Sequence, residues 1–482
     1  MGFTLWDEGF LWYGVKEVVN GGIPLRDFSA YDPGRYYWSS FFVSALGDDG
    51  IMNLRFSNAI LEFLAFYIAL SVTCFSKNKL YIEQILLNCV IIFLWLLMPF
   101  KAIDIACCIV LIASLGLLID QQKNYLYFLY GLQLGIVAFF GRNHGLYGLL
   151  SILMGLIWIY LNKNKKFDLK RAILLIISGL ILGYSPMFFM IIFINGYYKE
   201  LIGSIIFLFK IKATNLGLAI PWPRLIDISF ENFASKSRDV VIGLFFTCLF
   251  IFPVFAFLRL VISKIKCRKI NPFFVSSTFM SLQYLHYAIS RADIWHLSLG
   301  IYPALIGALI YLNDYSRRTI FISLSILCGL SLWVTLPEHP WWSCRFNDNC
   351  KEVYVGADKM LVDPMTYSDI ALLNELVSKH VEKSDNFMVT PFFPGAYPLF
   401  NKSSPIWEIY AFYPRDLEFQ KTEIQGIKNK NPKFILINDI AVDWREDVKF
   451  QNTHPITYQY ILDNYQEQPN QPHPNYKVFI PK

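Results

Sequence analysis

The chain has 482 residues, of which 55% are hydrophobic and only 17% are charged, and its mean hydropathy is +0.40. This composition excludes an ordinary soluble globular protein, because a soluble core of this size does not need so many apolar side chains. A bilayer must therefore be the solvent for much of the chain. The net charge of +6 is modest, and aromatic residues near the ends of apolar runs favour membrane-interface belts over nucleic-acid stacking. Membrane lipids are expected partners, and nucleic acid is not.

The first part of the chain is acidic and aromatic, and it contains no stretch long enough to cross a bilayer. It begins without the basic region of a cleavable signal peptide. An acid pair, Asp7-Glu8, lies near its start, and Tyr13 and Arg26-Asp27 follow. We expect residues 1–53 to form an extracytoplasmic first loop that carries this acidic motif.

The middle of the chain predicts a polytopic helical membrane domain over residues 54–336. A spanning helix takes roughly 17 to 25 mostly apolar residues. About ten stretches qualify, namely 54–75, 80–99, 102–120, 125–141, 145–161, 171–195, 239–260, 272–290, 295–312 and 318–336. Every second connection is basic and belongs in the cytoplasm by the positive-inside rule, including Lys77, Lys79, Lys163, Lys165 and Lys166. An even number of spans leaves both ends of the chain outside.

Export of the first segment without a preceding helix is difficult to explain. We therefore expect a first helix to be missing from a chain that begins at Met1, through a late start codon or a truncated gene model. A shorter apolar stretch, residues 201–209, is flanked by lysines and predicts an interfacial helix in the headgroup plane.

The tail, residues 337–482, turns polar and predicts a small extracytoplasmic α/β domain. We expect strands at 386–390 and 433–437 and an amphipathic helix at 369–380. Cys344 and Cys350 form the only plausible disulfide in an oxidising compartment.

Ionisable residues gather at the outward ends of the predicted spans. Asp104 lies at the third span, Arg142 and His144 lie at the fourth, and a further cluster between the eighth and ninth consists of Arg291, Asp293 and His296. Such residues are costly at a membrane unless they meet a partner, a cavity or water. Because they share a side with Asp7-Glu8, we expect one cavity. Carboxylates there could deprotonate a hydroxyl nucleophile, while Arg and His could hold a phosphorylated leaving group.

Each cluster has a simpler interpretation. Asp7-Glu8 could be a solvated loop pair, and Asp104 could be the N-cap of its helix. Arg142 and Arg291 could be interface anchors whose stems snorkel. The histidines could be interface residues whose ring nitrogens already have hydrogen-bond partners. The joint placement on one side is what favours a site.

The first segment resembles the first outer loop of GT-C glycosyltransferases, the group that includes protein O-mannosyltransferases and the lipid A aminoarabinose transferase. The likeness lies in an ordered pattern of acid pair, Tyr, Gly-x-Pro, Arg-Asp-Phe and Pro-Gly, found at Asp7-Glu8, Tyr13, 22–24, 26–28 and 33–34. It continues through Asp104, Arg-Asn-His-Gly at 142–145 and Arg-x-Asp-x-x-His at 291–296, and then through an extracytoplasmic tail domain.

The resemblance implies an inverting transfer from a polyprenyl-phosphate sugar, with an acid of the first loop as base. It assigns Asp7 as the base and Glu8 as a supporting residue or an acceptor contact. Asp104 becomes a second acidic contact, Arg142 and Arg291 hold the donor phosphate, and His144 and His296 lie with them. Asp293, Tyr13, Arg26 and Asp27 are further site residues. The family is divided over metal use; no residue spacing here is typical of a metal site, and we lean towards no obligatory metal.

These arguments predict a hexosyl- or pentosyltransferase of a bacterial inner membrane, with its active site facing the periplasm. The acceptor is a hydroxyl of lipopolysaccharide, another glycan, a lipid or a protein. One alternative is a transporter or flippase of a lipid-linked glycan, which should show related halves or broken helices; the sequence indicates neither. The other is a non-catalytic, decayed paralogue.

Overall fold

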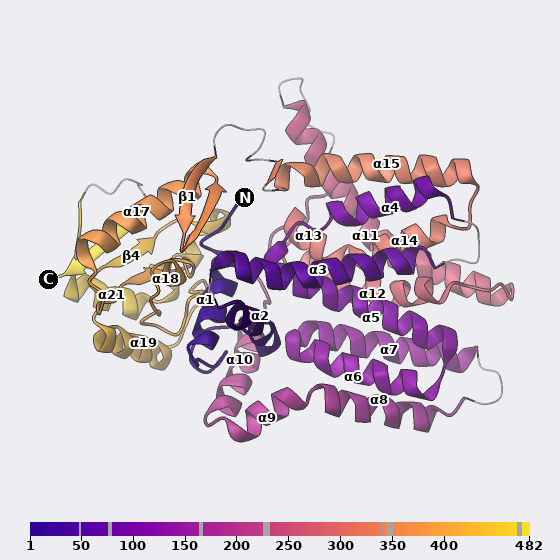
Figure 1. Ribbon diagram of the computed structural model, residues 1–482, viewed down its shortest axis with the longest axis horizontal. Coiled ribbons are helices and arrows are strands. Elements are labelled where there is room, and N and C mark those ends of the chain that lie inside the picture. Colours follow the sequence, from indigo (N-terminus) through magenta and orange to yellow (C-terminus); the bar gives the residue numbers. More distant parts are fainter. Residues whose placement is uncertain are drawn as a thin grey trace. The chain divides into compact units, whose positions relative to one another are not determined.

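The computed structural model describes residues 1–47, 50–75, 80–162, 167–224, 232–339, 341–342, 344, 350–469 and 475–482. The chain divides into two compact units (Figure 1). The first, which we call the terminal unit, comprises Met1–Ser57, Lys199–Ile211 and Pro340–Lys482. The second, which we call the bundle, comprises Asn58–Tyr198 and Lys212–His339. The predicted cytoplasmic lysines Lys77, Lys79, Lys163, Lys165 and Lys166 lie outside the described residues.

The regular elements of the bundle are all helices in the part of it that the structure describes. It contains most of α3 (Ile51–Thr73), followed by α4 (Ile82–Leu94), η1 (Pro99–Lys101), α5 (Ala102–Gln121), α6 (Asn124–Phe140), α7 (Arg142–Leu161), α8 (Leu169–Gly183), α9 (Ser185–Phe193), α11 (Phe233–Ile265), α12 (Pro272–Ile289), α13 (Ile294–Gly300), α14 (Tyr302–Leu312), α15 (Arg317–Thr335) and η2 (Leu336–Glu338). Each predicted span thus coincides with a helix or with a pair of helices.

Fewer of these helices than expected are long and apolar enough to cross a membrane. Within the described ranges there are five, or up to seven if each bent pair counts as one span. The bent pairs are α8 with α9, at 51°, and α13 with α14, at 58°. Broken helices, which the sequence did not indicate, are therefore present. The apolar helices α4 and α6 are too short to meet the same test.

Glycines bring α6 and α8 into close backbone contact, as Figure 1 shows for these neighbouring helices. A Cβ on Gly131 of α6 would lie 2.1 Å from the carbonyl oxygen of Ile176, and one on Gly183 of α8 would lie 2.0 Å from that of Leu132. Both helices carry a G-x-x-x-G pattern, at 131–135 and 179–183. Small residues spaced in this way allow helices in lipid to gain van der Waals contact that larger side chains would prevent.

The terminal unit combines the start of the chain with its tail. Its elements are α1 (Asp7–Val19), α2 (Pro33–Leu46), the first turns of α3, most of α10 (Tyr197–Ile211), β1 (Lys351–Val355), β2 (Asp358–Val362), α17 (Pro364–His380), β3 (Met388–Thr390), α18 (Ala396–Leu399), α19 (Leu417–Lys430), β4 (Ile435–Asn438), η3 (Val442–Trp444), η4 (Glu446–Val448), α20 (Phe450–Thr453), α21 (Pro455–Asn464), β5 (Tyr465–Glu467) and β6 (Tyr476–Pro481).

The tail is an α/β fold, as predicted. Strand β3 pairs in parallel with β4, which pairs with β6 in antiparallel fashion, and β5 forms the far edge. The helix expected at 369–380 begins earlier, at Pro364, because Asp363 caps it by accepting hydrogen bonds from the N–H groups of Met365 and Thr366. Buried side chains from both strands and helices, including Ile435 and Ile461, fill its core.

The segment expected as the first outer loop is largely helical, because α1 and α2 lie within it. Asp7 and Glu8 form the first turn of α1, where acidic side chains are favoured by the positive end of the helix dipole. The apolar and aromatic residues that follow them are buried against other parts of the terminal unit rather than exposed in a loop.

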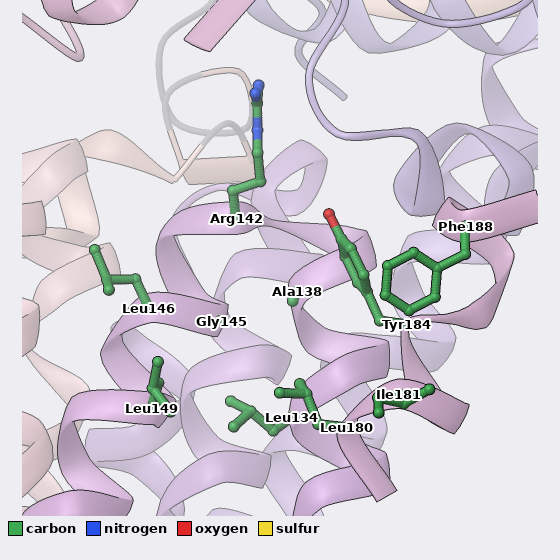
Figure 2. Close-up of a pocket in the computed structure, with 10 residues that line it drawn as sticks. All are labelled: Leu134, Ala138, Arg142, Gly145, Leu146, Leu149, Leu180, Ile181, Tyr184 and Phe188. Carbon is green, nitrogen blue, oxygen red and sulfur yellow. The ribbon is translucent and has the colours of Figure 1, made fainter. Parts of the chain in front are cut away.

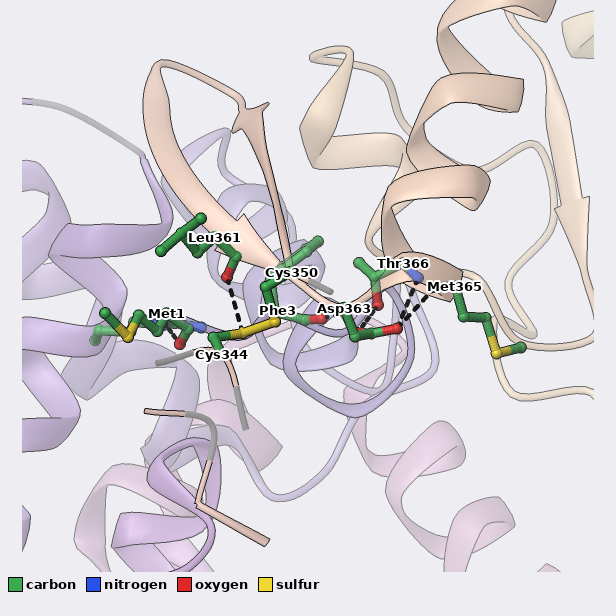
Figure 3. The surroundings of a disulfide bond; sticks show 9 residues. Met1, Phe3, Cys344, Cys350, Leu361, Asp363, Met365 and Thr366 are labelled. Atoms are coloured by element: carbon green, nitrogen blue, oxygen red, sulfur yellow. Dashed lines mark hydrogen bonds between the residues drawn. A yellow bond between two sulfur atoms is a disulfide. The ribbon is translucent and has the colours of Figure 1, made fainter. Parts of the chain in front are cut away.

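Cys344 and Cys350 are joined by a disulfide, as predicted, and Figure 3 shows its surroundings. The start of the chain lies beside the tail there. The N–H of Gly2 donates to the carbonyl oxygen of Leu361 at 2.8 Å, and the hydroxyl of Thr366 donates to that of Phe3 at 3.3 Å.

Helix α10 contains the segment predicted to lie at a membrane interface. Its Phe207 ring packs under the guanidinium group of Arg415, 3.6 Å from the ring centroid, and Lys210 lies 3.5 Å from the carboxylate of Asp416. Phe209 on the same helix is 78% exposed. One side of α10 is thus held by the tail, and another side is apolar and uncovered within the described residues.

We expect Gly179→Ala to destabilise the bundle, because its new Cβ would lie 2.2 Å from the carbonyl oxygen of Phe128. Overpacking of this kind costs about 1–3 kcal/mol. The matched control is Gly329→Ala in α15, where no atom lies within 4 Å of the added Cβ. Thermal unfolding in detergent should show a lower midpoint for Gly179→Ala alone; equal midpoints would contradict the close-packing argument.

Candidate functional site

A buried hydrogen-bonded group in the bundle centres on Asp104 and His144. The His144 Nε2 atom lies 2.9 Å from the Asp104 carboxylate, which also accepts a hydrogen bond from the Tyr287 hydroxyl at 3.0 Å. On the other side of the ring, Nδ1 lies 2.7 Å from the hydroxyl of Tyr284. Asp104 and His144 are 3% and 1% exposed. Helices α5, α7 and α12 each contribute to this group.

This arrangement changes the expectations for both residues. Asp104 is not the N-cap of its helix, because Lys101 occupies that position and Asp104 lies in the first turn. Both ring nitrogens of His144 are engaged inside the protein, so the expectation that it binds a donor phosphate is not supported. The contacts of His144 match the simpler interpretation, in which the ring nitrogens of the histidine are already hydrogen bonded within the protein. We infer that His144 fixes the orientation of Asp104.

A second group links Arg291, Asp293 and His296 beside the start of α13. Asp293 caps this helix, accepting from the backbone N–H of His296 at 2.8 Å, and it also pairs with Arg291 at 2.8 Å and with the His296 ring at 2.9 Å. His296 Nε2 lies 2.6 Å from the Asn215 amide nitrogen, and Arg291 donates to the carbonyl oxygen of Leu216. The sequence pattern Arg-x-Asp-x-x-His therefore produces one connected group, which also holds the segment at 215–216.

Arg142 lies at the end of an apolar groove of about 310 Å³ in the bundle. Figure 2 shows its side chain extending beyond the apolar residues that line the groove. The lining comes from α6, α7, α8 and α9, and it comprises Leu134, Ala138, Gly145, Leu146, Leu149, Leu180, Ile181, Tyr184 and Phe188. A cation at the mouth of an apolar groove fits an amphiphile whose charged end is anionic.

The two carboxylates of the acid pair have different surroundings in the terminal unit. Asp7 is exposed at the start of α1. Glu8 is 5% exposed and forms a two-pronged ion pair with Arg55, with distances of 2.6 and 2.7 Å. Arg55 also donates to the carbonyl oxygen of Gly2 at 2.5 Å. Of the two roles expected for Glu8, its contacts favour that of a supporting residue over contact with the acceptor.

Gly9, which completes the acidic motif, lies against the backbone of the tail. A Cβ at this position would be 2.6 Å from both the Cα and the nitrogen of Gly395. The N–H of Gly395 in turn donates to the carbonyl oxygen of Leu5 at 2.9 Å. The turn that presents Asp7 is thus fixed by direct backbone contact with the tail.

The remaining candidates of the first segment have structural partners. The Tyr13 hydroxyl accepts the N–H of Ser404 at 3.2 Å, and burial, reinforced by the charge of Glu17, raises the pKa of Tyr13 well above its ordinary value. Arg26 and Asp27 pair with one another, and the hydrogen bond from Arg26 lowers the pKa of Asp27. Asp27 also accepts the N–H of Ile23 at 2.8 Å. These contacts stabilise the segment after α1.

The candidate residues thus fall into several local groups and one groove, and the sequence had indicated only some members of each group. Arg55, Tyr284, Tyr287 and Asn215 were missed. Arg55 had a usable signal, because a charged residue near the start of an apolar stretch requires a partner. The tyrosines and the asparagine carried no comparable signal in the sequence. Among the residues that the structure describes, no three His, Cys, Asp or Glu side chains are grouped as metal ligands would be.

Comparison with known proteins gives a structural likeness only. No known family profile matches the chain, and no curated protein matches it. The crystal structure of ArnT from Cupriavidus metallidurans in the apo state matches with a TM-score of 0.56 at 8% identity, over 98% of this chain and 93% of that one. AglB from Archaeoglobus fulgidus, an oligosaccharyltransferase in complex with an inhibitory peptide and a dolichol-phosphate, gives a TM-score of 0.43 at 10% identity, over 99% and 72% of the two chains.

The likeness to ArnT extends over nearly the whole of both chains, and it establishes the fold. The protein is a helical membrane protein with a GT-C glycosyltransferase fold, as the motifs of the first segment predicted. At 8% identity the likeness is one of fold alone.

We expect Arg55→Gln to destabilise the terminal unit strongly, because it leaves the Glu8 carboxylate buried without its ion-pair partner. Breaking a buried pair costs roughly 3–5 kcal/mol. Adding Glu8→Gln should recover much of this loss, since no unpaired charge then remains. Denaturant unfolding of the single and double variants measures the coupling between the two residues; additive effects would contradict this account of Glu8.

Proposed function

We propose that the protein is an inverting glycosyltransferase that moves a sugar from a polyprenyl-phosphate donor to a hydroxyl of a glycan, lipid or protein acceptor. The observation that carries this proposal is the apolar groove with Arg142 at its mouth, in a chain with a GT-C fold. A polyprenyl phosphate has the chemistry that such a groove fits, because its chain is apolar and its head is an anion.

In the proposed reaction, Asp7 accepts the proton of the acceptor hydroxyl. The hydroxyl oxygen attacks the anomeric carbon, and the bond between that carbon and the phosphate oxygen breaks on the opposite face, which inverts the centre. The lipid phosphate leaves with its negative charge, which Arg142 stabilises as it develops. We choose Asp7 over Glu8 as the base because Asp7 is exposed at the helix start, whereas Glu8 is buried in its ion pair with Arg55.

We propose supporting roles for the other candidates. Asp104, oriented by His144, is a second acidic contact. Arg291 is a further residue for the donor phosphate, with Asp293 and His296 holding its position. We place the protein in the inner membrane of a bacterium, with the reaction on the periplasmic side, because the basic connections belong in the cytoplasm.

A transporter or flippase of a lipid-linked glycan is the second candidate. The two bent helix pairs favour it, since broken helices occur at the binding sites of many transporters. An assay of sugar transfer in detergent distinguishes the two candidate functions. Translocation requires two compartments, which detergent micelles do not provide, whereas sugar transfer does not require them.

We expect Asp7→Asn to abolish transfer, because an amide cannot accept the proton. Two forms are expressed, the unchanged chain and the chain with a membrane helix fused to its N-terminus. Both are assayed with a panel of polyprenyl-phosphate sugars. The matched control is Asp463→Asn on the exposed side of α21, which should keep full activity. Full activity in Asp7→Asn would remove Asp7 from the mechanism.

We expect Arg142→Gln to raise the KM for the donor roughly tenfold or more, since hydrogen bonds to charged groups contribute about 1.5–3 kcal/mol. The control is Arg268→Gln, an exposed cation after α11 that lies outside the groove. The KM for the acceptor should not change in either variant. A donor KM equal to that of the unchanged protein would show that Arg142 does not bind the phosphate.

A further inference from the structure

Glu62 lies at the midpoint of α3, a helix of 23 residues that is apolar and long enough to span a membrane. It shares a stripe of this helix with Asn58, Ala65 and Ala69, which are 2%, 0% and 0% exposed. The neighbouring Phe63 is 68% exposed. Glu62, itself half-buried, therefore lies on the inward side of α3, near the middle of the helix, where an ionisable residue indicates function.

Three polar atoms near Glu62 lack hydrogen-bond partners among the described residues. They are the Oε1 of Glu62, the Oδ1 of Asn58 one helical turn away, and the hydroxyl of Tyr302, and each is buried. Tyr302 is 0% exposed and interacts electrostatically with Glu62. It begins α14 at the bend that separates this helix from α13. Buried polar atoms left without protein partners are the usual ligands of ordered water.

A series of polar side chains connects this position with the buried group around Asp104. Tyr302 interacts electrostatically with Cys108, without a hydrogen bond from its hydroxyl among the described residues, and the Cys108 thiol lies within hydrogen-bonding range of the hydroxyl of Tyr284. Tyr284 lies 2.7 Å from His144, which contacts Asp104. The side chains come from α3, α5, α7, α12 and α14, so they extend across the interior of the bundle.

We propose that Glu62 is the proton-binding residue of a hydrated polar site inside the bundle, joined through Tyr302, Cys108 and Tyr284 to His144 and Asp104. No cation interacts with Glu62 within the described part of the chain. A carboxylate without a counter-charge is costly in this environment, so the carboxyl group holds its proton and donates a hydrogen bond to water. Asn58 and Tyr302 supply the other partners of that water.

Infrared spectroscopy of the full chain in liposomes tests this proposal without any activity assay, so its outcome is independent of the proposed function. The spectrum of the unchanged protein minus that of Glu62→Gln should contain the carbonyl band of a protonated carboxyl group at neutral pH. Carboxylate bands in its place would overturn the proposal. The matched control is Glu83→Gln at the start of α4, whose carboxylate pairs with Arg317 and should give carboxylate bands only.

Two further measurements test whether the Glu62 site is hydrated and whether Glu62 is coupled to His144. In deuterated buffer the Glu62 band should shift within minutes, as a hydrated carboxyl group exchanges its proton; an unchanged band would mean a dry site. His144→Gln should shift the Glu62 band, whereas Glu83→Gln should not. If Glu62→Gln fails to fold, Glu62→Asp replaces it, because the band must then change frequency. A band that stays in place would belong to another residue.

Discussion

Inside a bilayer, a polar side chain has to find its partners within the protein, and this constraint explains most of the bundle interior. Asp104 and His144 satisfy one another with two tyrosines, and Arg291 is held by Asp293. Glu62 stands out because the described residues provide it with no equivalent partner. The same constraint that identifies structural pairs therefore also identifies the position where a proton and water are needed.

The adjacent acids of the first segment illustrate how backbone position divides two roles. Glu8 is directed inward and is neutralised by Arg55, whereas Asp7 stays exposed at the helix start. Gly9 allows the backbone of the tail to approach closely, which fixes the first turn of α1 that carries both acids. A dipeptide of two similar residues thus yields one buried, ion-paired carboxylate and one exposed carboxylate, to which we assign the role of base.

Close helix packing shapes the groove that we assign to the donor lipid. The G-x-x-x-G patterns of α6 and α8 bring the two backbones together, and residues between and beside these glycines, such as Leu134 and Leu180, line the groove. Arg142 begins the adjoining helix α7 and supplies the cation at the mouth. The apolar wall and the charged end therefore depend on the same local packing, which suits an amphiphilic ligand.

The sequence alone determined the membrane character, the positions of the bundle helices, the α/β tail, the disulfide and the GT-C fold, because these follow from composition, periodicity and ordered motifs. It also indicated Asp104, Arg142 and Arg291 as charged residues at the ends of apolar helices, which require a partner, a cavity or water. Only the tertiary structure decided that His144 is hydrogen bonded to Asp104 and that Glu8 forms an ion pair with Arg55. It also decided that the segment expected as a loop contains helices. Such pairings join residues far apart in the chain, and the distances that select one partner over another exist only in the folded protein.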